Sequence, residues 1–379
     1  MDFDWSDTDE QLYQAARAFA ESRLRVVGSC TPPPFSLERF RLCGEFGLLG
    51  LSVPKDLDGM GLGALSTAHV IEGFAHGARD PGLVFAACAH LFACVMPIAE
   101  HGRDALKAHL VPRLCRGELV GSNAITEAEA GSDVFALKTQ ATRDGDSYVL
   151  NGTKTYVTNG PLADVILVYA VTNPKHGYLG ISAFAVESTM PGVVRGEPFQ
   201  KIGLHDSAIG QIYFQDCRVP AANLLGTEGG GAAVFNASMH WERACLFALY
   251  LGAMDDELAT TIDYARLRKQ AGKSIGKYEA VSHRIVDMKL RLEAARLLLY
   301  RACWRFDAGK DAHLDISLSK LAVSEAAVSS AMDAVRIHGG LGVIAEVGIE
   351  SHLRDAIPGL IFSGTSEIQR NLVAARLGL

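Results

Sequence analysis

The sequence lacks the short motifs that commonly hold a metal ion or a nicotinamide cofactor. Its eight cysteines form no C-x-x-C pair and its twelve histidines form no H-E-x-x-H motif, so no metal site is expected. No G-x-G-x-x-G lies between a strand-like and a helix-like segment, which disfavours a Rossmann enzyme. Scattered cysteines without a leader-like segment predict reduced thiols and a cytoplasmic location.

The sequence also has fewer basic residues than acidic ones, with 36 Lys and Arg against 43 Asp and Glu. The formal net charge is −7 and the sequence pI is near 6.0, so no nucleic-acid partner is predicted. One stretch, residues 81–99, carries no formal charge and approaches the length of a membrane-spanning helix. It contains His90 and Pro97 and is flanked closely by Asp80 and Glu100. These features favour a helix buried inside a soluble protein, without a membrane partner.

The hydrophobic pattern divides the 379 residues into three regions. Residues 1–120 have a helical period and predict an N-terminal helical domain. Residues 121–231 contain short β-prone runs and predict a β-barrel or sandwich. Residues 232–379 return to long helical periods, typical of a four-helix bundle. The predicted fold class is therefore α+β, mostly α.

Within the middle region, the segment 147-SYVLNGTKTYVTNG-160 has two β-prone runs on either side of Asn151-Gly152. Asn-Gly between such runs predicts a hairpin turn. Further strands are expected at 164–172, 181–187 and 210–220. In the last region, apolar residues spaced by three and four predict a long helix over 278–308.

Five segments, in this order, resemble the acyl-CoA dehydrogenase family: 124-AITEAEAGSD-133, 151-NGTKTYVTNG-160, 200-QKIGLHDS-207, 334-AVRIHGGLG-342 and 363-SGTSEIQR-370. Each segment alone is weak, but their order and spacing cover nearly the whole chain. The resemblance implies FAD bound between the β domain and the bundle, with its ADP end reaching a second subunit. A dimer or a dimer of dimers is therefore expected.

The resemblance assigns residues to both ends of the cofactor. Ile125 and Thr126 would face the flavin ring, and Ser132 would lie near the flavin and the thioester. Tyr156 takes the place of a flavin-stacking tryptophan, and Thr158 that of a hydroxyl donor. The rest of the cofactor would be lined by Arg268 at the pyrophosphate and by Gln270, Arg336, Gly340, Thr365 and Glu367. Without the resemblance, Tyr156 reads as an ordinary strand aromatic and the glycines near Gly340 as a helix end.

The catalytic base departs from the common pattern. Removal of the weakly acidic α-proton of a thioester needs a positioned base, and many family members carry a glutamate directly before the G-T-S motif. Here that residue is Ser363. A minority of the family carries the base on the first helix of the bundle, where this sequence has Glu242. The alternative is that Glu242 only pairs with an arginine; Ser363 would still contribute through its backbone N–H.

Further departures lie where the substrate and the adenosine would bind. His240 replaces an acid that commonly contacts the pantetheine arm, and it is predicted with Arg243 and Ser132 to bind substrate. Glu279 and Arg336 stand where glutamines are usual, and we expect Arg336 to offset the charge of Glu279.

The resemblance implies α,β-dehydrogenation of an acyl thioester on a carrier protein or CoA, in a biosynthetic, secondary-metabolite pathway. The electron acceptor is expected to be an electron-transfer flavoprotein or oxygen. A catabolic acyl-CoA dehydrogenase, a non-catalytic relative and a flavin hydroxylase are the alternatives.

Overall fold

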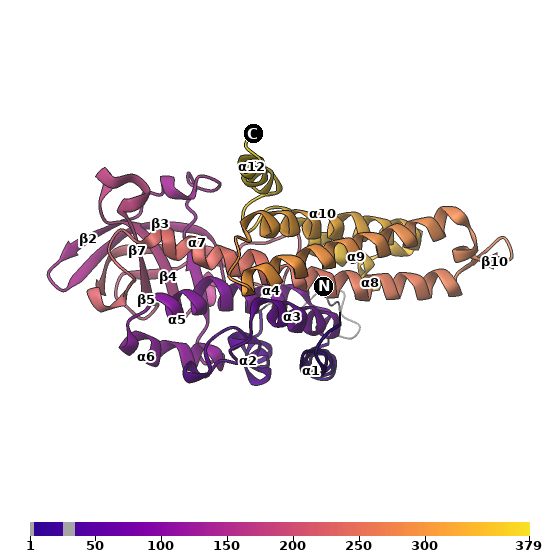
Figure 1. The fold of residues 1–379 in the computed structure, drawn as a ribbon, viewed down its shortest axis with the longest axis horizontal. Coiled ribbons are helices and arrows are strands. Elements are labelled where there is room, and N and C mark those ends of the chain that lie inside the picture. Colours follow the sequence, from indigo (N-terminus) through magenta and orange to yellow (C-terminus); the bar gives the residue numbers. More distant parts are fainter. Residues whose placement is uncertain (1–3, 26–34) are drawn as a thin grey trace.

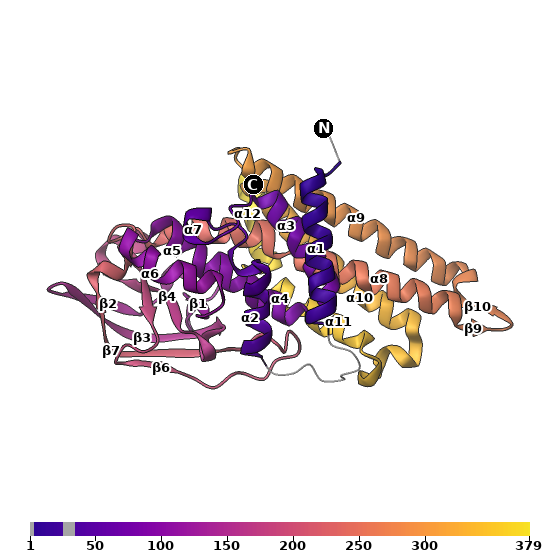
Figure 2. The same ribbon diagram turned by 90° about the horizontal axis from the view of Figure 1, so that it is seen from below.

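A computed structural model describes residues 4–25 and 35–379. The sheet lies at one end of the molecule, and three long helices run side by side away from it (Figure 1). The N-terminal helices lie across the junction between these two parts (Figure 2). The α+β class, with helical domains on either side of a β domain in the chain, is confirmed.

The N-terminal region is helical, as its period predicts. Its helices are α1 (Asp7–Arg23), α2 (Leu37–Phe46), α3 (Ala64–Ala78), α4 (Pro81–His90), α5 (Met96–His101) and α6 (Asp104–Cys115). Ser6 and Ser36 cap α1 and α2, because each side chain accepts a hydrogen bond from the backbone N–H three residues on. Gly47 ends α2 in the left-handed conformation.

The uncharged stretch forms a core helix. α4, a π-helical turn at Leu91–Val95 and α5 run continuously over Pro81–His101, and the most apolar window of this helix is 100% buried inside the protein. Seven described cysteines are free and buried, as expected for reduced thiols; Cys30 lies outside the described residues.

The middle region forms one mixed sheet with the order β6-β7-β3-β2-β4-β5-β8, to which β1 adds by pairing with β4 in parallel. The strands are β1 (Gly121–Ala124), β2 (Gln140–Asp144), β3 (Ser147–Thr158), β4 (Val165–Val171), β5 (Ile181–Glu187), β6 (Val193–Arg195), β7 (Ile209–Pro220) and β8 (Leu224–Leu225). Side chains alternate along β4: Leu167 and Tyr169 join the large helical core, while Ile166 and Val168 belong to a second core within the β domain. One face of the sheet is thus fixed against the helices.

The hairpin prediction at Asn151-Gly152 was wrong. β3 runs through both residues, and its pairing with β7 shifts register between Leu150 and Gly152. The glycine is needed because a Cβ there would lie 2.4 Å from Thr139 Oγ1. The actual turn joins β2 to β3 at Gly145, which has φ 60°. Asn-Gly therefore marks a bulge here, and Asp-Gly-Asp marks the turn.

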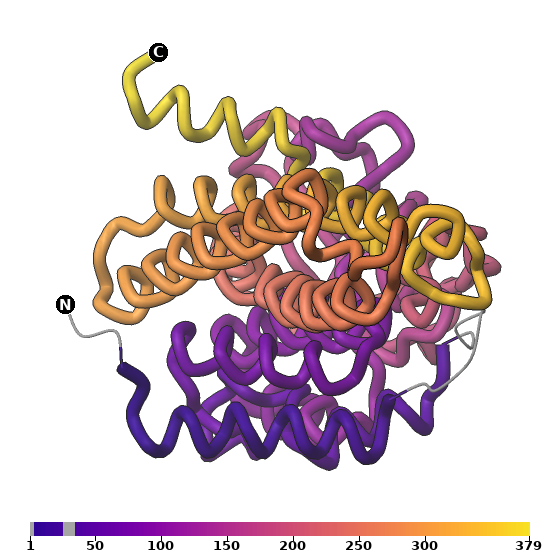
Figure 3. Tube along the Cα trace, turned by 90° about the vertical axis from the view of Figure 1, so that its right-hand side faces the viewer, coloured from indigo at the N-terminus to yellow at the C-terminus, as the bar shows by residue number. Residues whose placement is uncertain are grey.

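The C-terminal region begins with α7 (Gly231–Trp241), which continues through a π-helical turn (Glu242–Leu246) toward α8 (Ala248–Leu267). A short hairpin of β9 (Lys269–Gln270) and β10 (Lys273–Ser274) leads to α9 (Glu279–Asp307). The remaining helices are α10 (His313–His338), α11 (Ile349–Ala356) and α12 (Ser366–Arg376). α8, α9 and α10 pack together, and α12 projects from the body of the protein (Figures 1 and 3).

Candidate active site

Glu242 lies where α7 passes into the π-helical turn, and it is only 8% exposed. Its carboxylate accepts a hydrogen bond from the hydroxyl of Ser363. Single π-helical turns are frequent at functional sites because they redirect side chains without ending the helix. α7, the π-helical turn and α8 together form one long helical rod. The turn directs the Glu242 carboxylate from this rod into the protein interior.

Ser363 sits in a strained turn just before α12. Its φ is 57°, in the left-handed region that non-glycine residues rarely adopt, and Gly364 follows with φ 89°. The Ser363 carbonyl accepts hydrogen bonds from Arg243 Nε at 2.7 Å and from Gln369 Nε2 at 3.3 Å. Such strain persists where surrounding contacts over-determine the conformation.

The contacts bear on the alternative reading of Glu242. In the part of the chain that the structure describes, no ion pair joins Glu242 to an arginine; Arg243 is turned to the Ser363 carbonyl instead. Burial raises the pKa of Glu242, although the Ser363 hydrogen bond and the Arg243 charge act in the lowering direction. Burial also lowers the pKa of Arg243, against the raising influence of Glu242. A buried carboxylate with a raised pKa is suited to accepting a proton near neutral pH.

Aromatic rings surround this turn. Phe362, directly before Ser363, packs on Phe85 with ring centroids 4.5 Å apart and on Phe247 at 5.2 Å. These rings limit the access of water and hold the turn in place.

His240 lies two residues before Glu242 and packs edge-on against His313, with ring centroids 4.1 Å apart. Burial, helped by the nearby His313, lowers the pKa of His240 to about 4. The imidazole is therefore neutral at physiological pH, able to donate one hydrogen bond and accept another. His313 in turn contacts Asp311, which also pairs with Arg376 at the end of α12.

The residues expected at the flavin ring occupy one edge of the β domain. Ile125 and Thr126 follow β1, and Tyr156 and Thr158 lie near the end of β3. The Tyr156 side chain is 64% exposed, with φ 54°. The ring packs in part against Phe199, with centroids 5.9 Å apart, and leaves most of its surface open to a ligand.

A buried ion pair that sequence reasoning missed holds this edge together. Lys154 is fully buried, and its Nζ donates to the Ile125 carbonyl at 3.0 Å and to Glu127 at 2.8 Å. Burial lowers the pKa of Lys154 to about 8, against the raising effect of Glu127. Burial alone would raise the pKa of Glu127, but Lys154, together with hydrogen bonds from Thr139 and the Lys138 N–H, lowers it below its usual value. A lysine at an inward-facing position of a strand was the sequence signal that could have predicted this buried ion pair.

Ser132 is exposed in the loop before Val134–Ala136. Next to this loop is a surface hollow of about 440 Å³, lined by Phe135, Tyr178 and Leu179 and by Ala232 and Asn236 of α7. Pockets of this size commonly hold small ligands. Three of the hollow's lining residues, Ala232, Ala233 and Asn236, belong to α7, the helix that precedes Glu242.

The remaining predicted cofactor residues lie in three other places: at α12, at the β9–β10 tip and at the end of α10. Thr365 caps α12 and accepts from the Ile368 N–H, while Glu367 on the same helix is exposed. Arg268 and Gln270 lie at the β9–β10 tip, at the opposite end of the molecule from the sheet (Figure 1).

Arg336 and Gly340 are both exposed at the end of α10. The expected pairing of Arg336 with Glu279 is absent from the described residues: Arg336 instead lies 3.8 Å from Asp333, one helical turn away. Two side chains on one helix face meet more readily than side chains on separate helices.

These groups fit the chemistry of FAD. An exposed aromatic ring and a hydroxyl serve the ring system, and the exposed guanidinium of Arg268, which has no ion-pair partner among the described residues, suits a pyrophosphate. Within one chain, however, Arg268 lies at the opposite end of the molecule from Tyr156 and Thr158 (Figure 1).

The sequence matches three domain families in order. They are the N-terminal domain of acyl-CoA dehydrogenase over residues 6–118, its middle domain over 122–217 and its C-terminal domain over 229–378. An L-prolyl-[peptidyl-carrier protein] dehydrogenase from Pseudomonas fluorescens is 50% identical over the full length of both chains. One of the same description from Serratia sp. is 43% identical, covering 100% of this chain and 99% of the relative.

Solved structures agree in fold. PigA with FAD and proline superposes with a TM-score of 0.97 at 43% identity, covering 100% of both chains. The prolyl acyl carrier protein oxidase AnaB superposes with a TM-score of 0.96 at 40% identity, covering 99% of this chain and 100% of that one. The chain belongs to the acyl-CoA dehydrogenase family and is an FAD-dependent oxidoreductase acting on acyl thioesters.

Proposed function

We propose that this enzyme dehydrogenates a prolyl group held as a thioester on a carrier protein, with Glu242 as the base. The observation that carries the proposal is the buried Glu242 carboxylate, hydrogen-bonded by Ser363 at the position where many relatives carry the base themselves. The prolyl-carrier substrates named for the two relatives at 50% and 43% identity support the choice of acyl group.

The chain's own residues would divide the work as follows. Glu242 takes the proton from Cα, and its raised pKa makes it a stronger base than an exposed glutamate. FAD, when bound, supplies the acceptor for the hydrogen and the electron pair that leave the neighbouring carbon. The backbone N–H of Ser363 helps to hold the thioester oxygen on which negative charge develops. Arg243 fixes the Ser363 carbonyl and with it this N–H.

The thioester arm would enter through the hollow beside Ser132. Ser132 and the neutral His240 would then offer hydrogen bonds to the amide groups of the arm. Aromatic rings pack inward from the wall of the hollow: the Phe135 and Phe235 ring centroids are 6.0 Å apart, and those of Phe235 and the buried Tyr169 are 5.7 Å apart. An apolar lining with a few polar groups is the usual form of such sites.

The complete cofactor site would need a second copy of the chain. Arg268 and Gln270 are far from Tyr156 and Thr158 within one subunit (Figure 1), so a partner's tip would supply the pyrophosphate end. Exposed apolar side chains support such an assembly: Val286, Leu290 and Leu297 on α9 are 62%, 65% and 53% exposed. Arg336, Gly340, Thr365 and Glu367 would line the rest of the cofactor. The closed dimer, or dimer of dimers, is the expected form.

Reoxidation would use an electron-transfer flavoprotein or oxygen, and we infer a cytoplasmic location from the reduced, buried cysteines. Stopped-flow mixing of the reduced enzyme with air-saturated buffer distinguishes the two acceptors. Reoxidation within a turnover time favours oxygen, and slow reoxidation favours a protein acceptor.

The experiment that tests the function is anaerobic flavin bleaching with matched thioesters. We expect prolyl-carrier protein to bleach the flavin faster than prolyl-CoA, and butyryl-CoA to bleach it least. Bleaching by butyryl-CoA alone would replace the proposal with a conventional acyl-CoA dehydrogenase. Absence of bleaching by every thioester would favour the non-catalytic or hydroxylase alternatives.

A further inference from the structure

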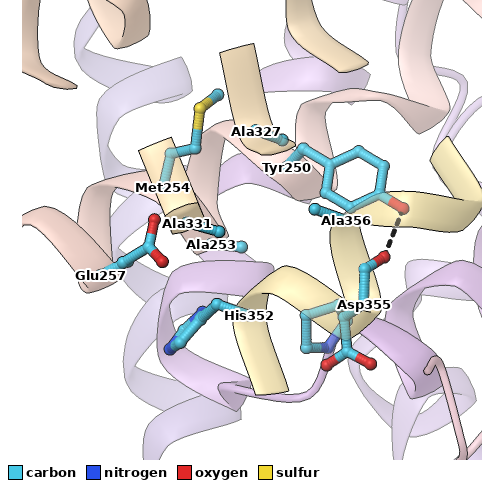
Figure 4. Close-up of a pocket in the computed structure, with 10 residues that line it drawn as sticks. Tyr250, Ala253, Met254, Glu257, Ala327, Ala331, His352, Asp355 and Ala356 are labelled. Atoms are coloured by element: carbon cyan, nitrogen blue, oxygen red, sulfur yellow. Dashed lines mark hydrogen bonds between the residues drawn. The ribbon is translucent and has the colours of Figure 1, made fainter. Parts of the chain in front are cut away.

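Tyr250 lies in the first turn of α8, eight residues after Glu242 on the same helical rod. It is 2% exposed, and its hydroxyl donates a hydrogen bond to the backbone carbonyl of Asp355 at 2.9 Å. Figure 4 shows this bond, directed to the C-terminal turn of α11. The last carbonyls of a helix have no partner within the helix, so the bond fixes the point where the chain leaves α11.

The Tyr250 ring contacts the segment that follows. This segment, Ile357–Phe362, contains the 3-10 turn Ile357–Leu360 and leads directly to Ser363. A Cβ at Gly359 would lie 2.8 Å from the ring edge of Tyr250, and the ring stacks on Phe362 with centroids 6.4 Å apart. Tyr250 therefore contacts the last turn of α11, just before the segment, and the middle and end of the segment itself.

Two sets of contacts connect Glu242 with the chain around Ser363. In the first, Tyr250 lies on the same helical rod as Glu242, and its hydroxyl and ring contact α11 and the Ile357–Phe362 segment. The second is the direct hydrogen bond that the Ser363 hydroxyl donates to Glu242. Because Ser363 directly follows the segment that Tyr250 contacts, a change at Tyr250 is expected to move the Ser363 hydroxyl relative to the carboxylate.

We propose that Tyr250 is a positioning residue, which sets the Ser363–Glu242 hydrogen bond by fixing the Ile357–Phe362 segment against the rod that carries Glu242. The proposal rests on the proposed function for its catalytic consequence, but the positioning itself concerns only described contacts of this chain. A small cavity of about 10 Å³, enough for one water, lies beside Tyr250 among Ala253, Ala327 and Ala331 (Figure 4). The ring thus has little free space into which to turn.

The pKa of Glu242 depends on the Ser363 hydrogen bond and can therefore be used to measure this positioning. The Ser363 hydrogen bond lowers the pKa of Glu242 against the effect of burial, as does the charge of Arg243. Two other titratable groups, Cys88 on α4 and Tyr169 on β4, feel the charge of Glu242; burial and this charge raise the pKa of both, so they stay neutral. Weakening the Ser363 bond therefore has one expected direction, toward a higher pKa for Glu242.

The test compares Tyr250→Phe with the parent holoenzyme. Phenylalanine keeps the ring contacts with Gly359 and Phe362 and removes only the bond to Asp355. The carboxyl stretching band that Glu242→Gln abolishes gives the titration midpoint of Glu242 by infrared difference spectroscopy, without turnover. We expect the midpoint in Tyr250→Phe to rise by roughly one pH unit and flavin reduction to slow by about 10-fold.

Tyr264→Phe is the matched control, because Tyr264 also lies on α8 and donates to a helix-end carbonyl, that of His338, at 3.3 Å. Its midpoint should equal the parent's. The double variant Tyr250→Phe with Ser363→Ala should titrate like Ser363→Ala alone, since both changes act on one bond. An unchanged midpoint in Tyr250→Phe, or additive shifts in the double variant, overturns the positioning role. Failure of all thioesters to bleach the parent flavin overturns the proposed function but leaves the midpoint comparison decisive for Tyr250.

Discussion

The hydroxyl of Ser363 donates a hydrogen bond to the carboxylate of Glu242, joining a turn before the last helix to a π-helical turn 121 residues earlier in the chain. The resemblance to the family implies that its members carry the base at one or the other of these two positions. In this chain one position supplies the carboxylate, and the other supplies a donor that orients it and opposes the rise in its pKa caused by burial.

Glu242→Gln should remove proton abstraction while preserving the fold, because the amide has nearly the same shape and can still accept from Ser363. Flavin reduction by substrate should slow by roughly 10²–10⁴-fold, the usual contribution of a positioned base. Rapid-mixing absorbance at constant FAD content measures this rate. Glu257→Gln is the control: Glu257 is 1% exposed, on the same rod, and has no described contact with Ser363. Equal rates in parent and Glu242→Gln would exclude Glu242 as the base.

The pH dependence of flavin reduction follows from the same carboxylate. Burial raises the pKa of Glu242, and only the deprotonated form accepts the α-proton. The rate should therefore rise with pH through a midpoint above the ordinary range of glutamate, and this rise should be absent from Glu242→Gln. A rate that is flat with pH in the parent, measured with stable FAD content, would contradict the assignment.

Ser363→Ala should have a smaller effect than Glu242→Gln, because the backbone N–H remains. Loss of the hydroxyl donor should move the midpoint of the pH profile upward by roughly one unit. At high pH most of the parent rate should return. Combining Ser363→Glu with Glu242→Gln should restore measurable flavin reduction if both positions address the same α-carbon. Complete loss of reduction in Ser363→Ala at every pH would instead indicate that the hydroxyl itself takes part in the chemistry.

Sequence patterns predicted the elements whose side chains repeat regularly. The three- and four-residue spacing around Met288 and Leu292 placed α9, observed at Glu279–Asp307, almost to the residue. Asn151-Gly152 misled because the dipeptide permits both a turn and a bulge. The choice depends on a tertiary contact, the approach of Thr139 to Gly152, which no local pattern contains.

The candidate site shows a similar division. The missing carboxylate at Ser363 directed attention to Glu242 from sequence alone, but the bond between them depends on two turns meeting across the fold. Lys154 and Tyr250 were missed because neither belongs to a recognisable catalytic pattern. Their importance comes from where their polar atoms end, at the carbonyls of Ile125 and Asp355.

A buried cluster at the junction of the N-terminal and middle regions should make stability depend on pH. Arg39 of α2 bridges Asp80, which caps α4, and Asp206, which follows β6. Burial, with the nearby Asp80 charge, raises the pKa of Asp206 from 3.8 to about 8. A carboxyl group whose pKa is raised by folding stabilises the folded state most at low pH, where it is protonated. This contribution is lost as pH rises through about 8.

Asp206→Asn imitates the protonated acid at every pH. The Tm of the variant relative to the parent should therefore increase between about pH 5 and pH 8, by roughly 2–5 °C. Thermal unfolding by circular dichroism across this range measures the difference. Asp263→Asn, at an exposed side chain of α8, should show no such trend. A Tm difference that is constant with pH would mean that Asp206 is already ionised throughout.

The last prediction concerns the separation of Arg268 from the flavin-ring residues. Arg268→Ala should weaken FAD binding by roughly 10–100-fold, the loss of a charge-assisted contact, whereas Lys269→Ala at the same exposed tip should change it little. Co-expression of Arg268→Ala with Glu242→Gln then decides which chain supplies the arginine. If the site is shared, a mixed dimer contains one site with both Glu242 and Arg268 intact. Random pairing would restore about a quarter of the parent rate at limiting FAD. If each chain built its own complete site, both chains of the mixture would remain defective. The rate would then not exceed the sum of the two variants measured separately.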